Sequence, residues 1–192
     1  MLNTVLAILL ASSLAVAGGA WSLVSVLNNR QGTGALVVGA WTAFPKIGSP
    51  DADPYSKART SREGILALGS AEGIAFSATT DTAGDALRAE CSYRIEGNVP
   101  TSRFWTLVAN GDQPAPERPA RLPALNSQSV LRRADSSFAV TVAAHPAAGN
   151  WLQNSGTGPM ALVLTIYDTN LTTGSEFSEI LMPGIEPLGC DA

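Results

Sequence analysis

The chain has 192 residues, a length that accommodates one soluble domain of ordinary size and leaves no room for a second large one. With 45% hydrophobic residues the bulk of the chain is not disordered, and a net charge of −4 argues against binding to a nucleic-acid backbone. All 28 formal charges, 12 basic and 16 acidic, lie after residue 29, so the low charged fraction of 15% is largely a property of the N-terminal segment.

Residues 1–29 form an uncharged, mostly apolar leader. About 20 apolar residues suffice to cross the hydrocarbon layer of a bilayer, so the leader predicts a transmembrane helix that serves as an uncleaved signal anchor. Two alternatives remain: a signal peptide cleaved after Ala17 in the small-residue site Ala15-Val16-Ala17, and a buried core helix. The leader has no Lys or Arg before Arg30, so the distribution of positive charge does not fix its orientation.

The first predicted strand follows a short flexible linker. The linker is residues 30–35 (RQGTGA), and residues 36–44 (LVVGAWTAF) are rich in β-branched and aromatic side chains and end at Pro45. We expect one continuous strand there, at the start of a domain that covers residues 36–192.

One short amphipathic helix is predicted over residues 54–68. Asp53 suits the N-cap position, Pro54 suits the first helical position, and Gly69 suits the end of the helix. The polar side carries Lys57, Arg59, Arg62 and Glu63. These basic residues face either solvent, as on an ordinary surface helix, or an acidic lipid headgroup or phosphate.

Further strands are predicted between clusters of turn residues, at 73–79, 89–96, 103–109, 136–143 and 159–168. Alternation is clean in the fourth of these, and the fifth is apolar on both faces, as expected of a central strand. Residues 113–123 contain four prolines, which cannot pair in a ladder, so we expect a surface loop. The whole pattern is typical of a mainly β protein with an antiparallel β-sandwich.

Cys91 and Cys190 are the only cysteines. In an oxidising compartment an even number of cysteines indicates a disulfide, whereas in a reducing cytosol two distant thiols are more often inert. Cys91 alternates in phase with Tyr93 and Ile95, so its sulfur should point inward, and a bridge to Cys190 would hold the C-terminal tail. We therefore predict a Cys91–Cys190 disulfide, with a redox or metal-binding role as the less favoured alternative.

Four segments, taken in order and spacing, resemble a bacterial family, the domain of unknown function 1214 (DUF1214). They are YRIEGNVPTSRFWTL (93–107), DSSFAVTV (135–142), GNWL (149–152) and MALVLTIYDT (160–169). The leader and DPYSKARTSREGILALG (53–69) are similar to the short, membrane-anchored alphaproteobacterial members, so the resemblance covers most of residues 36–190. It implies a β-sandwich of jelly-roll character and no activity, because the family has no established reaction. The ending LMPGIEPLGC (181–190) departs from the family's usual Trp and paired Pro.

The candidate binding residues are Arg103, Trp105, Trp151, Tyr167 and Asp168, with Glu96 as a further acidic partner. An arginine beside tryptophans suits a carboxylate or a sugar ring, because Arg forms paired hydrogen bonds and Trp offers an apolar face. The structural alternative is that Arg103 pairs with Asp168 or with a loop carbonyl at the rim of the sandwich and the tryptophans belong to the core.

No catalytic residue, metal site or cofactor is predicted. His145 is the only histidine, precedes Pro146, and has no histidine or cysteine at metal-ligand spacing. The chain also lacks the GxSxG nucleophile motif and the GK[ST] ending of a phosphate loop.

The leading hypothesis is a noncatalytic envelope domain that is anchored in the inner (cytoplasmic) membrane by a single helix. It would face the periplasm and bind a partner protein or an envelope glycan, and no nucleic acid. If the leader is cleaved, the same domain is secreted to the periplasm. The alternatives are an envelope hydrolase or lyase, in which Arg103 orients a sugar or peptide substrate in a pocket, and a subunit of a larger membrane complex with an exposed apolar patch.

Overall fold

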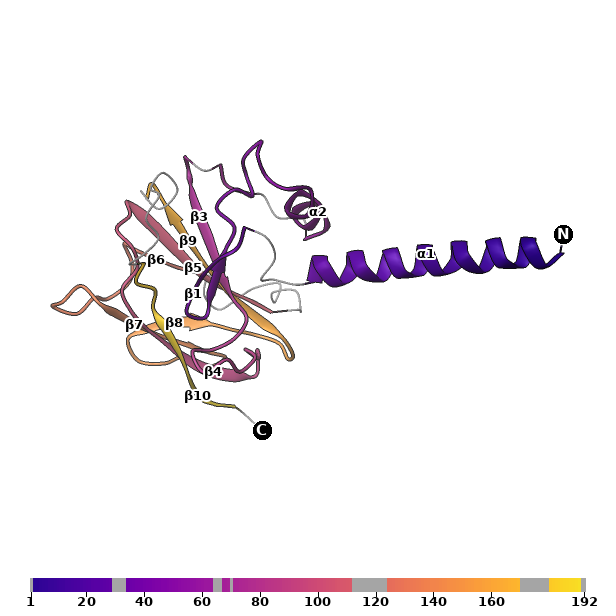
Figure 1. Cartoon of the computed structure of the whole chain (residues 1–192). Coiled ribbons are helices and arrows are strands. Elements are labelled where there is room, and N and C mark those ends of the chain that lie inside the picture. Colours follow the sequence, from indigo (N-terminus) through magenta and orange to yellow (C-terminus); the bar gives the residue numbers. More distant parts are fainter. Residues whose placement is uncertain are drawn as a thin grey trace.

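A computed structural model shows a long N-terminal helix and two β-sheets (Figure 1). It describes residues 2–28, 34–63, 67–69, 71–111, 124–169 and 180–190. The helices are α1 (Leu2–Asn28) and α2 (Pro54–Glu63). The strands are β1 (Leu36–Val38), β2 (Trp41–Ala43), β3 (Gly73–Ala78), β4 (Cys91–Gly97), β5 (Phe104–Gly111), β6 (Ala124–Asn126), β7 (Phe138–Ala143), β8 (Asn150–Gln153), β9 (Met160–Tyr167) and β10 (Gly184–Cys190).

The two sheets have different strand orders. The first is β1-β2-β3-β9-β5-β6, and every pair in it is antiparallel. The second is β10-β4-β7-β8, in which β7 and β8 are parallel and the other pairs are antiparallel. The predicted mainly β fold is confirmed, and the single parallel pair makes the second sheet mixed.

Both sheets contribute alternate side chains to one buried core. In β9 every second residue from Met160 to Ile166 is buried, and β7 buries Phe138, Val140 and Val142. Burying one such side chain contributes about 1.5 to 3 kcal/mol, so the register of each strand is strongly specified by its apolar face. The central position predicted for β9 is confirmed, because β9 lies between β3 and β5.

The prediction of one strand over residues 36–44 is wrong. The segment forms a tight hairpin in which Val38 pairs with Trp41. Gly39 lies in the turn with a φ of 57°, a conformation that glycine adopts without the strain a side chain would bring. Trp41, directly after the turn, is buried, and its indole Nε1–H donates to the carbonyl of Pro183 at 2.7 Å. This hydrogen bond joins the first sheet to the segment that leads into β10.

The predicted start of α2 is confirmed. The Asp53 Oδ1 atom accepts hydrogen bonds from the backbone N–H groups of Tyr55 and Ser56, each at 3.0 Å. The Ser56 hydroxyl also donates to Asp53 Oδ2, and this bond, together with the backbone bonds, lowers the pKa of Asp53. The helix ends at Glu63 in the described residues, and residues 64–66 lie outside them. The predicted end at residue 68 is wrong, because residues 67–69 are described and are not helical.

The helix α1 extends away from the sheets (Figure 1). Over residues 2–26 every side chain is exposed, and a stretch of 25 residues has a mean hydropathy of 1.8. The alternative of a buried core helix is therefore wrong, because α1 buries none of this stretch against the rest of the protein. Its length and composition fit a membrane anchor or a signal peptide.

Most of the predicted linker, residues 30–33, and the whole proline-rich loop 113–123 lie outside the described residues.

Candidate functional site

One end of the sandwich brings together three of the five predicted binding residues. At this end β4 and β9 finish while β5 and β7 begin, because Phe104 pairs with Tyr167 and Gly97 pairs with Phe138. We call it the Arg103 rim, defined by Glu96, Arg103, Arg132, Arg133, Tyr167 and Asp168.

Arg103 and Asp168 form an ion pair at the edge of the first sheet. The Arg103 Nη1 to Asp168 Oδ2 distance is 3.5 Å, and the two side chains are 83% and 68% exposed. Asp168 has a φ of 51°, and its backbone N–H donates to the Glu72 carbonyl at 3.1 Å, which fixes the turn after β9. The half-buried Tyr167 ring lies 5.9 Å from that of Phe104. Arg103, Tyr167 and Asp168 therefore share one rim.

The two predicted tryptophans are buried and are not part of the exposed surface of the rim. Trp105 is 1% exposed and stacks on Phe138 across the sandwich, with 5.0 Å between ring centroids. Within the described part of the chain, its indole N–H has no hydrogen-bond partner. Trp151 is also buried, in β8 of the second sheet, and its Nε1–H donates to the Ala143 carbonyl at 2.9 Å. Both tryptophans are core residues, as in the structural alternative.

Arg132 belongs to the rim although the sequence reasoning did not single it out. Its guanidinium carbon lies 5.9 Å from the Trp105 ring centroid and 6.0 Å from that of Phe138, which is within cation–π range. Its Nη1 donates to the Ser136 carbonyl at 3.0 Å, so the group is held over the aromatic pair while remaining exposed. The only available sequence signal was the Arg132-Arg133 pair shortly before a strand.

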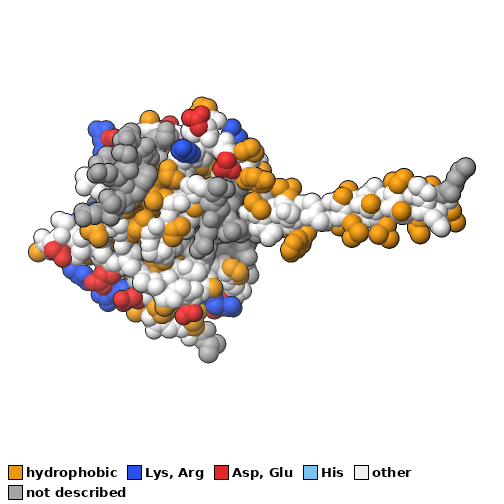
Figure 2. All heavy atoms as spheres, viewed as in Figure 1, with side chains coloured by type: hydrophobic (Ala, Val, Ile, Leu, Met, Phe, Trp, Pro, Cys, Tyr) orange, Lys and Arg blue, Asp and Glu red, His pale blue; other side chains and the backbone are white. Residues whose placement is uncertain are grey.

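Glu96 pairs with other arginines rather than with Arg103. It accepts hydrogen bonds from Arg133 Nη1 and from Arg94 Nε, the latter at 2.6 Å. These bonds lower the pKa of Glu96. At the same loop, hydrogen bonds from Ser137 lower the pKa of Asp135. Figure 2 shows acidic and basic side chains alternating along the lower left of the sandwich, on the side away from α1.

The lowered pKa of Glu96 predicts a loss of stability in acid. A carboxylate whose pKa is lower in the folded state stabilises the fold at every pH above its ordinary pKa, which is 4.5 for this Glu. The stabilisation is lost as the pH falls through the pKa of the folded state. As the pH is lowered below about 4.5, we expect the urea concentration at the unfolding midpoint of the wild type to decrease. In Glu96→Gln this decrease should be smaller. Tryptophan fluorescence across a pH series measures this. Arg133→Gln should also weaken the dependence of the urea midpoint on pH. If both variants keep the pH dependence of the wild type, the lowered pKa of Glu96 is not the cause of the loss of stability.

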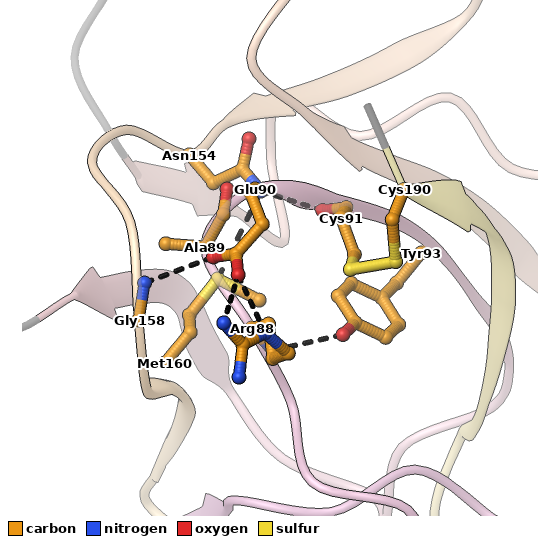
Figure 3. Close-up of a disulfide and its surroundings, with 9 residues drawn as sticks. All are labelled: Arg88, Ala89, Glu90, Cys91, Tyr93, Asn154, Gly158, Met160 and Cys190. Carbon is orange, nitrogen blue, oxygen red and sulfur yellow. Dashed lines mark hydrogen bonds and ion pairs between the residues drawn. A yellow bond between two sulfur atoms is a disulfide. The ribbon is translucent and has the colours of Figure 1, made fainter. Parts of the chain in front are cut away.

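The opposite end of the sandwich holds the predicted disulfide, which is confirmed. Cys91 and Cys190 are bonded to each other and are directly paired residues of β4 and β10, 99 positions apart in sequence (Figure 3). The buried Asn154 amide donates to the carbonyls of Ala89 and Cys91 at 3.0 and 2.9 Å. This end is therefore closed by structural contacts.

Replacing Arg103 with Ala tests whether the rim is structural. Ion pairs this exposed contribute about 0 to 1 kcal/mol, so we expect the free energy of unfolding of Arg103→Ala to fall by no more than about 1 kcal/mol. Urea denaturation of the full chain in detergent measures the change. A loss of several kcal/mol would mean that Arg103 holds the fold together and is not a free binding group.

Within the described ranges, no group of three or more His, Cys, Asp and Glu residues lies close enough to hold a metal ion. The only histidine, His145, is exposed.

The fold and the site define a β-sandwich protein with an apolar N-terminal helix, closed by a disulfide at one end and edged by exposed arginines at the other. The chain belongs to the family described as "Protein of unknown function (DUF1214)", which matches residues 72–171. That match is shorter than the 36–190 suggested by the resemblance, and it covers β3 to β9 but neither helix nor β10.

Two solved structures are similar to the chain. The VPA0106 protein from Vibrio parahaemolyticus has 16% sequence identity and a TM-score of 0.54 over 72% of this chain, and this chain covers 36% of that protein. A putative uncharacterized protein from Burkholderia cenocepacia has 15% identity and a TM-score of 0.44, with 92% of this chain and 51% of that protein covered. The first similarity supports the fold alone. Among curated proteins, none matches the chain.

Proposed function

We propose that the protein is a noncatalytic binding domain held at the inner membrane of a bacterial cell and facing the periplasm. It would be one of the short, membrane-anchored alphaproteobacterial members of the DUF1214 family. Residues 1–29 would be the anchor, 30–35 the linker and 36–192 the binding domain. The observation that carries the proposal is α1, an apolar helix without charge whose residues 2–26 are all exposed outside the sandwich.

The disulfide supports placing the domain on the periplasmic side of the membrane. Disulfides persist in oxidising compartments and are rare in a reducing cytosol. The Cys91–Cys190 bridge joins paired residues of neighbouring strands, so it is part of the folded structure rather than an incidental contact. A domain on the periplasmic side of the inner membrane would form and keep this bond.

The test of placement is membrane fractionation combined with trapping of thiols in cells. We expect the chain to stay in the membrane pellet after alkaline carbonate washing, with its N-terminus intact and with both cysteines protected from alkylation unless reductant is added. An N-terminus that begins after Ala17, together with release into the periplasmic fraction, would support the cleaved alternative. Free thiols in untreated cells would contradict periplasmic exposure.

The Arg103 rim is the proposed binding face, and an envelope protein or glycan is the proposed ligand. The rim presents guanidinium groups to solvent at Arg103 and Arg132, and guanidinium groups bind carboxylates through paired hydrogen bonds. It also lies at the opposite end from the disulfide, which is occupied by structural contacts.

Site-specific photocross-linking in intact cells tests this face. A photoreactive residue in place of Thr101, an exposed neighbour of Arg103 at the same rim, should give a discrete cross-linked product while Arg103 stays in place. The matched control is Thr157, an exposed residue near the disulfide end between β8 and β9, which should give none. The same product from both positions, or none from Thr101, would contradict the assignment of the rim as the binding face.

A further inference from the structure

The helix α2 lies next to the point where α1 approaches the sandwich. The two helices contact each other, and Figure 1 shows α2 beside the end of α1 that is nearer the sheets. If α1 spans the inner membrane, as in the proposed function on which this inference rests, this end lies near the bilayer surface. The helix α2 then lies at the level of the lipid headgroups.

Basic and acidic residues are unevenly distributed between the N-terminal part of the chain, which contains α1 and α2, and the rest of the domain. Residues 1–63 contain five basic and three acidic side chains, whereas the remainder contains seven basic and thirteen acidic ones. Three of the basic residues fall within the ten residues of α2, at Lys57, Arg59 and Arg62, against the single acid Glu63. Anionic lipids attract basic residues near the bilayer surface and repel an acidic body. This division of charge therefore favours an orientation with α2 toward the membrane.

The exposed surface of α2 has both properties that a membrane interface requires. Lys57 and Arg62 are exposed, and Lys57 Nζ uses one hydrogen bond, at 3.0 Å, to the Pro50 carbonyl. Tyr55 is 47% exposed, and tyrosine rings are enriched at headgroup level because one end is apolar and the other polar. Ser56 and Ala52 are buried, so α2 is seated on the protein and presents this surface outward.

We propose that α2 lies on the bilayer and binds the phosphate groups of anionic phospholipids through Lys57 and Arg62, with Tyr55 at the headgroup boundary. This contact orients the sandwich on its anchor. The Asp53 cap keeps the first turn of α2 helical, so the helix is formed before it meets the lipid.

The test is hydrogen exchange of the full chain in lipid nanodiscs. One set contains phosphatidylglycerol, which is anionic, and the other contains only phosphatidylcholine. We expect the backbone amides of residues 55–63 to exchange about five- to thirty-fold more slowly in the anionic discs. Lys57→Gln combined with Arg62→Gln should remove most of that difference. Arg103→Gln combined with Arg132→Gln removes the same charge from the Arg103 rim and should leave the difference intact.

The outcomes separate this inference from the proposed function. A chain that does not copurify with the discs contradicts the anchor, and this inference falls with it. A chain that copurifies but shows equal exchange in both lipids overturns the lipid contact alone. An equal effect of the two double variants would show a response to net charge rather than a contact made by α2, and would also overturn the inference.

Discussion

Replacing Cys91 and Cys190 together with Ser is expected to lower the free energy of unfolding by about 3 to 5 kcal/mol. The bridge closes a loop between residues 99 positions apart, and in the chain-entropy model a loop of about 100 residues is worth about 4.7 kcal/mol. Urea denaturation of the full chain in detergent, followed by tryptophan fluorescence, measures the change. The double variant avoids leaving one free thiol.

Reduced wild-type protein is the control for this experiment. It should unfold at the same urea midpoint as the double Ser variant, because both lack the same bond. Ser92→Ala, next to Cys91 in β4, should remain close to the oxidised wild type. A loss below about 1 kcal/mol in the double variant would contradict a stabilising role for the bridge.

Replacing Trp105 with Ala is expected to destabilise the protein by about 3 to 5 kcal/mol. The ring is almost fully buried, stacks on Phe138 and lies beneath the guanidinium of Arg132, so its removal leaves a large cavity between the two sheets. The same urea titration, with Trp41 and Trp151 as the remaining buried reporters, measures the loss.

Trp105→Phe is the matched variant for this prediction. It keeps an aromatic ring and removes a buried indole N–H that has no partner in the described residues, so it should cost clearly less than Trp105→Ala. A cost below about 1 kcal/mol for Trp105→Ala would contradict the core position and return Trp105 to the candidate binding surface.

Much of the fold could be predicted because a half-buried strand alternates in sequence. This signal located β3, β4, β5, β7 and β9 to within a few residues, and it correctly placed the Cys91 side chain inward. The strands β6, β8 and β10 were missed. The strands β6 and β8 are short, and β10 contains Pro187 and two glycines, residues that indicate turns in isolation. Tertiary pairing makes them strands.

The candidate site was harder to predict because sequence spacing does not show where a strand begins. The predicted strand 103–109 includes both Arg103 and Trp105, and they were grouped because an arginine beside tryptophans suits a carboxylate or a sugar ring. The strand β5 begins at Phe104, so Arg103 lies outside it and is exposed while Trp105 is buried. Arg132 comes from a distant segment, and only the packing of Phe138 against Trp105 brings it to the rim.

Protease treatment of spheroplasts tests the central claim most directly, because it reports the side of the membrane on which the sandwich lies. We expect protease added after removal of the outer membrane to degrade residues 36–192 while a cytosolic control protein stays intact. Protection of the domain, with degradation of a control protein known to face the periplasm, would contradict the account.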